Sequence, residues 1–453
     1  MTGCVAVFDV GKTNLKLVVF DRDGQVVADR ARPNASLAPD ADCPYLRLDT
    51  ERAWDFLLAA LKEVGARHPI EAISISAHGA SGVLVTDAGV ALPPMDYEFD
   101  GFGAVDAAYD AARPPFEECF SPLSVRGLNL GRQIFYLERN FPEEFAAARA
   151  FLTYPQFWSW RLSGVMATEV TSLGAHTDLW RPKEGRPSSL VESQGWTRLF
   201  PPIRRAWETL GRPRPEVAAE TGLSPEVRIV CGAHDSNASL VPYLVSRKGP
   251  FTVLSTGTWV IIMAVGGRAP IDPKADMLAN VDVHGRPVPT ARLMLGREFA
   301  ALAGDTPAEA READVAAIVA SGVMAMPAFT DQGGPFAGRK GFIEGEAPKT
   351  PAARAALATV YCALMAAHVL KLLQAPGDLI VEGGFNRSPA FVGVLAALMP
   401  GRDVLVAPSS GAAEGAALLA HWDEPHAPPK PKRAEPWSAP GLREYQERWE
   451  SGL

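Results

Sequence analysis

The 453-residue sequence is poor in cysteine. Its five cysteines lie far apart and form no CxxC pair: Cys4, Cys43, Cys119, Cys231 and Cys362. An odd number of widely spaced cysteines argues against a disulfide framework and against a zinc site. We therefore expect reduced thiols and a cytoplasmic protein.

Long basic runs and long apolar runs are also missing. The formal net charge is −8, so we expect no basic face that could neutralise the phosphates of a nucleic acid. No stretch approaches the roughly 20 uninterrupted apolar residues that a membrane helix needs. The segment MTGCVAVFDVGKTN has no basic start followed by a long apolar run, so we do not expect a signal peptide. Nucleic acid and membrane are therefore not expected as partners.

The composition that remains is typical of a globular enzyme. Hydrophobic residues make up 47% and charged residues 21%, with 40 glycines and 39 prolines spread along the chain. A chain of this length is too long for one ordinary core, so two domains are expected, with a third left open.

The first part of the chain reads as an α/β unit. An antiparallel meander is predicted, with strands at residues 5–8, 15–20 and 25–28. Residues 50–65 have helical apolar spacing, with Thr50 as the expected cap. Residues 72–79 then form a short apolar strand, and the order strand, helix, strand predicts a crossover to a parallel neighbour.

The second part repeats this pattern. FTVLSTGTWVIIMAVGG, from Phe251, echoes the opening hairpin, and the linker near residues 241–250 is the expected domain boundary. Helices are then predicted at 350–373, 389–398 and 412–421, and strands at 379–386 and 403–408. Between the two parts lies an aromatic-rich region in which Trp158, Trp160 and Trp180 are expected in the core. The proline-rich segment EPHAPPKPKRAEPWSAP predicts a surface strap before a short terminal helix.

Two small turns are candidates for holding phosphate. In DVGKTNLK, Gly11 lets backbone N–H groups approach a phosphate, and Asp9 offers a carboxylate for Mg²⁺. The side-chain donors of this turn are Lys12, Thr13 and Asn14. An ordinary hairpin turn is the alternative, and the Walker pattern GxxxxGK[ST] is absent. LSTGTW, at residues 254–259, offers hydroxyl and amide donors in a second turn, and facing lobes would grip the phosphates from opposite sides.

Two further segments suggest a proton acceptor and a nucleotide site. Asp235, in CGAHDSNAS, ends a predicted strand, where it could take a proton from a substrate hydroxyl or cap a helix. His234 fits a packed or hydrogen-bonded histidine. In VEGGFNRSPAF, Gly383 and Gly384 allow a flat base or ribose to lie against the backbone and Asn386 can bond to it, although a plain strand-to-helix turn is the alternative. Small residues in SSGAAEGAALLA suit close helix packing at a hinge.

These segments, in this order and over essentially the whole chain, resemble the FGGY family of carbohydrate kinases, within the actin and hexokinase superfamily. FDVGKTNLK and LSTGTW are similar to the two phosphate motifs, and VEGGFNRSPAF to the adenosine motif. ISISAHGASGVLVTDAG and SSGAAEGAALLA are similar to the two connecting motifs. The resemblance implies an α/β fold of two ribonuclease-H-like domains with an interdomain cleft. The sugar-binding domain would be residues 1–243 and the nucleotide-binding domain residues 244–453.

The resemblance also implies roles for particular residues. Asp235 would be the catalytic base, and Asp9 would position the Mg²⁺ of Mg·ATP. ATP would be bound by Lys12, Thr13, Asn14, Thr256, Gly257, Thr258, Gly383, Gly384 and Asn386. The sugar would be contacted by Ala77, His78, Gly79, Asp96, Tyr97, Glu98, Gln156, Phe157, His234 and Asp235.

Departures from the family bear on the substrate. Many of its pentulose and glycerol kinases carry a tryptophan followed by Asp-Xaa-Arg where this chain has MDYEFDG, so the arginine is missing. The usual loop with a Gly-Glu-Arg core is replaced by PAFTDQGGPFAGRKG, at residues 327–341. The GTW of the second phosphate turn and the shorter length are closer to the rhamnulokinase and fuculokinase branch.

The implied reaction is ATP-dependent phosphorylation of a small sugar, such as a 6-deoxyketohexose (L-rhamnulose or L-fuculose) or a pentulose. Two alternatives stay open: a non-catalytic nucleotide-binding sensor, and a kinase acting on a polyol or a carboxylate. The acid at position 235 favours the sugar kinase, because a sensor needs no carboxylate on the sugar side. A homodimer is one assembly that the sequence leaves open.

Overall fold

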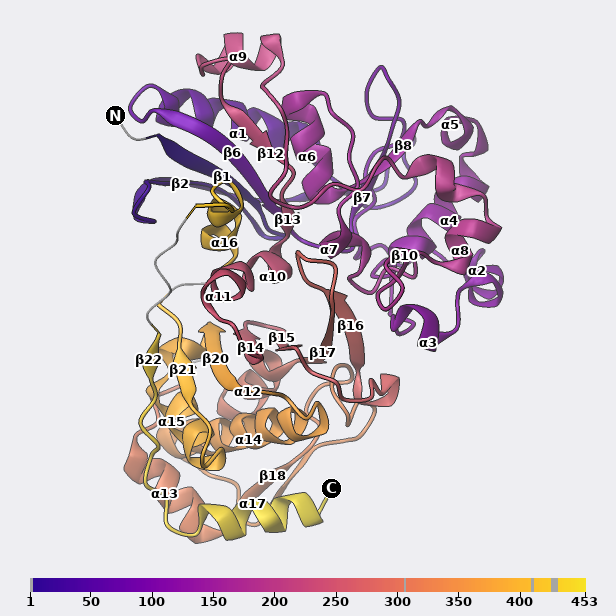
Figure 1. The fold of residues 1–453 in the computed structure, drawn as a ribbon. Coiled ribbons are helices and arrows are strands. Elements are labelled where there is room, and N and C mark those ends of the chain that lie inside the picture. Colours follow the sequence, from indigo (N-terminus) through magenta and orange to yellow (C-terminus); the bar gives the residue numbers. More distant parts are fainter. Residues whose placement is uncertain (1–2, 305–306, 409–410, 425–430) are drawn as a thin grey trace. The chain divides into compact units, whose positions relative to one another are not determined.

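The computed structural model describes residues 3–304, 307–408, 411–424 and 431–453 (Figure 1). The chain forms two compact units, each described here by itself. Unit 1 comprises Met1–Ser246, Ala279–Pro287 and Gly411–Ala427, and unit 2 comprises Arg247–Leu278, Val288–Ser410 and Pro428–Leu453. The predicted domain boundary between residues 243 and 244 stays a prediction. The sequence did not predict that two later segments, residues 279–287 and 411–427, belong to unit 1.

Unit 1 is built on a mixed sheet with the order β11-β12-β6-β1-β2-β3, and β13 also pairs with β6. Short pairs join β4 to β5, β7 to β8 and β9 to β10. The strands are β1 (Cys4–Val10), β2 (Asn14–Phe20), β3 (Val26–Pro33), β4 (Ser36–Leu37), β5 (Arg47–Leu48), β6 (Ile70–Ala77), β7 (Gly82–Val85), β8 (Ala150–Thr153), β9 (Trp180–Arg181), β10 (Arg186–Pro187), β11 (Thr209–Gly211), β12 (Arg228–Val230) and β13 (Ala233–His234).

The helices of unit 1 cover this sheet and fill the region after it. They are α1 (Thr50–Gly65), α2 (Asp106–Ala112), α3 (Phe116–Cys119), α4 (Leu130–Asn140), α5 (Pro142–Ala147), α6 (Tyr154–Ser163), α7 (Val170–Leu173), α8 (Ser189–Ser193), η1 (Trp196–Leu199), α9 (Pro215–Thr221), α10 (Asp235–Ala238), α11 (Val241–Ser246) and α16 (Ala412–Leu419). α16 comes from late in the chain and packs on β1 and β6 (Figure 1).

The predictions for the opening of the chain are largely confirmed. β1 pairs antiparallel with β2 and parallel with β6, as the meander and the crossover require. Helix α1 spans the predicted residues, but its cap is Asp49 and not Thr50. The Asp49 carboxylate accepts a hydrogen bond from the backbone N–H of Arg52, which satisfies a donor that the first turn leaves unpaired.

Strand β1 separates two apolar layers, because successive side chains of a strand point to opposite faces. Ala6, Phe8 and Val10 join the core that contains α1 and α6. Val5 and Val7 join the core that contains α10, α11 and α16. Asp9 follows the same alternation and lies near the carboxyl end of the strand, so its side chain points to the layer of α10.

Unit 2 repeats the hairpin and crossover around a sheet with the order β16-β17-β15-β14-β20-β21-β22. β14 pairs antiparallel with β15 and parallel with β20, which confirms the predicted echo of the opening hairpin. The strands are β14 (Phe251–Thr256), β15 (Val260–Val265), β16 (Met277–Val281), β17 (Pro287–Leu293), β18 (Met324–Met326), β19 (Phe342–Glu344), β20 (Asp378–Gly383), β21 (Val404–Val406) and β22 (Lys432–Arg433). Most of β16, from Ala279, and the first residue of β17 fall in the segment assigned to unit 1.

The helices of unit 2 follow the predicted alternation. They are η2 (Pro273–Ala275), α12 (Leu295–Ala303), α13 (Glu312–Ser321), α14 (Pro351–Leu372), η3 (Phe385–Arg387), α15 (Pro389–Leu398) and α17 (Leu442–Ser451). Within the expected strap, β22 pairs with β21 and the Trp437 N–H donates to the Gly393 carbonyl at 3.0 Å. Residues 409–410 of the second connecting motif and 425–430 of the strap lie outside the described residues.

Among the described residues, helix α14 has the length and composition of a possible membrane span, although Arg354, His368 and Lys371 interrupt its apolar residues. By length and composition it could cross a membrane, but 83% of its most apolar window is buried inside the protein. It packs against α12, α13 and α15 of the same unit. Burial on several sides accounts for its apolar character without a membrane.

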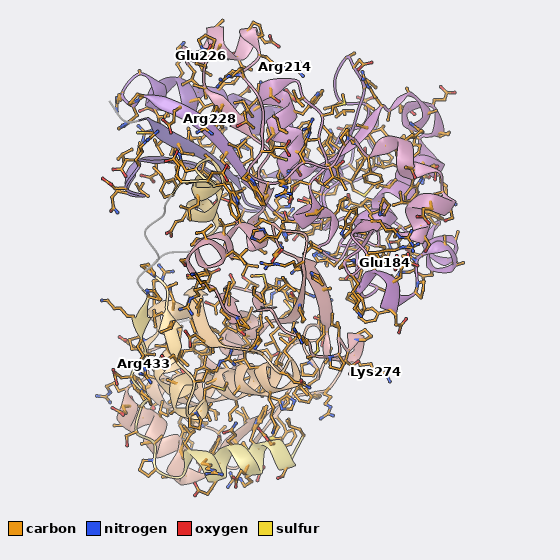
Figure 2. All side chains as sticks on the ribbon, in the orientation of Figure 1. Glu184, Arg214, Glu226, Arg228, Lys274 and Arg433 are labelled. Carbon is orange, nitrogen blue, oxygen red and sulfur yellow. The ribbon has the colours of Figure 1, made fainter. Side chains whose placement is uncertain are left out.

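Charged side chains lie on the surface of each unit, as Glu184 and Glu226 of unit 1 and Arg433 of unit 2 illustrate (Figure 2). Many are paired: Glu184 with Arg186 at 2.7 Å, and Arg433 with Asp403 at 2.9 Å. In the interior, Trp158, Trp160 and Trp180 are buried, as predicted.

Candidate functional site

The His-Asp pair lies where β13 ends and α10 begins. His234 holds the cap position and Asp235 is the first helical residue, so the alternative in which Asp235 is the cap is wrong. The His234 ring lies between two partners, with Nδ1 2.7 Å from Asn237 Oδ1 and Nε2 3.2 Å from Asp235 Oδ1. Asp235 Oδ1 also accepts the Ser236 N–H at 2.6 Å. The Asp235 side chain is 32% exposed, so one oxygen is held while the group stays accessible to a hydroxyl.

Asp9 is the second acid of this region. Burial raises the pKa of Asp9 from 3.8 to about 6, the negative charge of Asp235 adds to this effect, and Lys16 opposes it. The two carboxylates therefore act on each other, Asp9 from the end of β1 and Asp235 from the start of α10. A cation would relieve this repulsion.

This acidic pair fits a magnesium ion that arrives with a nucleotide. Mg²⁺ is usually bound by one or two carboxylates, several waters and substrate phosphates. Among the described residues, no group of three or more His, Cys, Asp and Glu side chains forms a ready metal site. Asp9, with Asp235 nearby, could hold the ion only if phosphate and water complete the shell.

Lys12 lies among residues predicted to bind the sugar. Its ammonium group pairs with Asp96, lies 3.4 Å from Glu98 and donates to Ser36 Oγ at 3.0 Å. Asp96 is completely buried. Burial would raise its pKa, but hydrogen bonds from Lys12 and Ser36 outweigh burial and lower the pKa of Asp96. The Lys12 charge is thus already partly neutralised, and its role in ATP binding stays a prediction.

His78 joins this cluster from the end of β6. Its ring packs against Tyr97 and Tyr154, at centroid distances of 5.6 and 4.8 Å. The pKa of His78 lies below its ordinary value, because burial lowers it by more than the negative charges of Asp235 and Asp96 raise it. Its Nε2 is buried and has no hydrogen-bond partner within the part of the chain that the structure describes. A neutral imidazole with a free nitrogen suits a substrate hydroxyl.

The structure thus brings together most of the residues that are predicted to contact the sugar. The cluster of polar and charged groups in unit 1, called the acceptor cluster below, comprises Asp9, Lys12, His78, Asp96, Tyr97, Glu98, His234 and Asp235. Gly79 makes room within it, because a Cβ there would lie 2.7 Å from His234 Nε2. Ser36, which bonds both Lys12 and Asp96 of this cluster, was not predicted, since a lone serine in the two-residue strand β4 carries no recognisable signal.

Gln156 and Phe157, which are predicted to contact the sugar, lie in the protein core. Both are completely buried. Gln156 Nε2 donates to the carbonyls of Cys231 and Gly232, each at 3.1 Å. The ring centroids of Phe157 and Trp158 lie 5.0 Å apart. Ala77 is also completely buried. Sugar contact by these three residues finds no support in this geometry, and Gln156 holds the segment that leads to His234.

The turn after β1 leaves the remaining donors at the surface. Thr13 and Asn14 are exposed, and Asn14 Nδ2 donates to Thr13 Oγ1 at 3.1 Å. The turn itself is closed by the Gly11 N–H, which donates to the Asn14 carbonyl at 2.9 Å. Phosphate binding by this turn stays a prediction.

In unit 2, the second phosphate motif and the adenosine motif lie side by side. The Thr256 hydroxyl donates to the Glu382 carbonyl at 2.5 Å and accepts the Phe385 N–H at 2.8 Å. The Thr256 carbonyl accepts the Gly384 N–H at 2.6 Å. Gly257 and Thr258 are exposed just beyond this junction, and Asn386 Nδ2 donates to the Ala407 carbonyl at 3.1 Å. A nucleotide could meet both motifs at this junction.

Gly383→Ala is expected to destabilise unit 2, whereas Gly384→Ala is not. Gly383 has a φ of +84°, and a Cβ there would lie 2.0 Å from the Thr256 carbonyl oxygen. The backbone conformation alone costs about 1–2 kcal/mol for an L side chain, and the contact adds to that cost. Gly384, with a φ of −65° and 3.7 Å of space, is the matched control. Urea unfolding of both variants checks this, and equal stability would contradict it.

Comparison with known proteins gives matches over both units. Residues 4–94 and 127–242 match the FGGY family of carbohydrate kinases, N-terminal domain, and residues 248–429 match the carbohydrate kinase FGGY, C-terminal domain. The crystal structure of a carbohydrate kinase from Novosphingobium aromaticivorans is 36% identical, with a TM-score of 0.92 over 100% of this chain and 98% of that chain. That of a xylulose kinase from Rhodospirillum rubrum shares the fold, with a TM-score of 0.78 and 21% identity over 99% of this chain and 98% of that one.

Curated relatives match part of the chain. L-fuculokinase from Escherichia coli (strain K12) is 26% identical over 266 residues, which are 57% of this chain and 56% of the relative. A rhamnulokinase from Bacteroides thetaiotaomicron is 28% identical over 249 residues, 52% of this chain and 50% of the relative. The chain therefore matches these relatives over about half of their length. With both halves matched and a solved relative similar along its whole length, the protein belongs to the FGGY family of carbohydrate kinases.

Proposed function

We propose that this protein transfers the γ-phosphoryl group of ATP to a hydroxyl of a small sugar, with Asp235 as the general base. The observation that supports it best is the accessible Asp235 carboxylate, which His234 and Ser236 hold within the acceptor cluster. A proton acceptor beside several hydrogen-bonding side chains suits an alcohol substrate.

In the proposed reaction, Asp235 takes the proton of the acceptor hydroxyl as its oxygen forms a bond to the γ-phosphorus. The bond from that phosphorus to the bridging oxygen breaks, and ADP leaves. Catalysis of this kind relies on positioning and on electrostatic stabilisation. His78 and the Lys12–Asp96 pair would orient the sugar, because together they offer donors and acceptors for its other hydroxyls.

The nucleotide would be bound by the junction in unit 2 that includes Thr256, Gly257, Thr258, Gly383, Gly384 and Asn386, and the turn at Lys12, Thr13 and Asn14 would contact the phosphates. Magnesium, held by Asp9 with phosphate and water, would supply positive charge for the transferring group. The exposure of Gly257, Thr258 and Gly384 supports this assignment.

The substrate we propose is a ketose, either a 6-deoxyketohexose (L-rhamnulose or L-fuculose) or a pentulose. The names of the curated relatives, L-fuculokinase and rhamnulokinase, support the first class. The cluster around MDYEFDG supports a polyhydroxylated acceptor, since Asp96, Tyr97 and Glu98 surround the Lys12 ammonium. We also propose a cytoplasmic location, in line with the five free cysteines.

An assay of acceptor-dependent ADP release tests this function. ATP and Mg²⁺ are incubated with the protein and with L-fuculose-derived and L-rhamnose-derived ketoses, D-xylulose, D-ribulose, glycerol or acetate, one at a time. We expect a ketose to raise ADP release above the acceptor-free rate, and glycerol and acetate to leave it unchanged. ATP binding without stimulation by any acceptor would point to the sensor, and stimulation by glycerol or acetate alone would point to a polyol or carboxylate kinase.

A further inference from the structure

A buried carboxyl group that the proposed reaction does not use is linked to the backbone of His234 through one hydroxyl group. Glu169 is completely buried and caps the short helix α7. Its Oε2 accepts the backbone N–H of Thr171 at 3.0 Å and also the Thr171 hydroxyl. The Thr171 hydroxyl oxygen in turn accepts the backbone N–H of His234 at 3.1 Å. A chain of hydrogen bonds therefore links Glu169 to the residue before Asp235.

The direction of these bonds gives each group a defined task. A hydroxyl has one proton and two lone pairs, and Thr171 gives its proton to Glu169. Its lone pair is therefore turned toward His234. Because buried N–H groups almost always have a partner, loss of this hydroxyl would leave the His234 N–H unpaired and free the backbone to move.

The neighbouring contacts show what such a movement would reach. His234 is held on its other side by β6, through its pairing with Ala77. Its ring contacts both Asn237 and Asp235, and Asn237 Nδ2 donates to the Val281 carbonyl at 2.5 Å. A shift of the His234 backbone would thus be passed directly to the Asp235 carboxylate.

We propose that Thr171, oriented by Glu169, is a positioning residue that holds the Asp235 carboxylate in place through the backbone of His234. This inference rests on the proposed role of Asp235 as the base. Burial raises the pKa of Glu169 to about 7, against the hydrogen bonds from Thr171 that lower it. A carboxyl group that is costly to ionise yet retained in the core is consistent with a role beyond packing.

Two substitutions at Thr171 test the role. Thr171→Val removes the hydroxyl and keeps a branched side chain, whereas Thr171→Ser keeps the hydroxyl and should rescue. We expect kcat of the valine variant to fall about tenfold to a hundredfold with little change in KM for ATP, because small displacements of catalytic groups have effects of this size. The serine variant should stay near wild type.

Thr221→Val is the matched control. Thr221 is equally buried in the same unit, and its hydroxyl donates to the Val217 carbonyl at 2.7 Å. Its loss should leave kcat unchanged. A valine variant at Thr171 that turns over like wild type, or a serine variant that fails as badly as valine, would overturn the positioning role.

Hydrogen exchange gives a second reading that does not need turnover. Exchange at the backbone amides of residues 231–239, measured by mass spectrometry, should become faster in Thr171→Val and not in Thr171→Ser or Thr221→Val. Unchanged exchange in the valine variant would refute the contact's role. Absence of acceptor-dependent turnover in the wild-type protein would instead refute the proposed function, so the two failures are distinguishable.

Discussion

Asp235→Asn is expected to lower acceptor-dependent turnover by about a thousandfold, within the range of 10² to 10⁴ typical of a general base. Asparagine has nearly the same shape and can still accept the Ser236 N–H that Asp235 accepts at 2.6 Å. Its amide cannot take the proton of the acceptor hydroxyl. The kcat for ADP release, measured with the preferred ketose, checks this expectation.

ATP binding by the same variant separates loss of chemistry from loss of structure. We expect the calorimetric affinity for ATP to stay close to the wild-type value, since the residues proposed to bind adenosine lie in unit 2. Asp110→Asn is the control, because Asp110 is exposed on α2 and should leave turnover unchanged. If Asp235→Asn turned over like the control, the base would have to be another group.

The local parts of this site could be predicted because they depend on short patterns. The alternation along β1 places the Asp9 side chain on the other face of the sheet from Phe8 and Val10, whatever surrounds the strand. The small residues before α10 and after β20 mark places where backbones come close. Gly415 illustrates the same rule, since a Cβ there would lie 1.8 Å from the Ala238 carbonyl oxygen. Its predicted close packing is confirmed, and its role in a hinge stays a prediction.

The long-range partners could not be predicted, because no periodicity fixes which distant side chains meet. Ser36 meets Asp96 across 60 residues of sequence, and Lys12 pairs with that carboxylate from a different turn. The family resemblance implies a sugar contact for Gln156, and that role stays a prediction. Its side-chain amide donates to the backbone carbonyls of Cys231 and Gly232, and no sequence pattern links Gln156 to these two residues.

The division into units also depended on distant contacts. α16 and residues 279–287 belong to unit 1 although both follow the start of unit 2 in the chain. Their local patterns are those of any apolar helix or strand, which can pack on either sheet. Only the shape of the facing surface decides, and for α16 that surface includes β1 and β6.

Asp9→Asn is expected to make the protein more stable at pH 8 and far less active. Folding raises the pKa of Asp9 from 3.8 to about 6, so the ionised carboxylate is less favourable in the folded state than in the unfolded chain. The penalty is absent below the unfolded pKa, grows as the pH rises toward the folded pKa and is complete above it. A shift of this size corresponds to up to about 3 kcal/mol, which the neutral asparagine would remove.

Urea unfolding at pH 8, 6 and 4.5 checks the sign, with the gap between variant and wild type expected to shrink as the pH falls. Asp96→Asn is the opposite control, because the pKa of Asp96 is lowered by Lys12 and Ser36 despite its burial and its carboxylate stabilises the fold above the unfolded pKa. That variant should lose stability at pH 8. A less stable Asp9→Asn protein at pH 8 would contradict the argument. A gain in stability with loss of turnover would mean that the charged Asp9 carboxylate destabilises the fold but is needed for activity. This is expected of a group that binds a cation during catalysis.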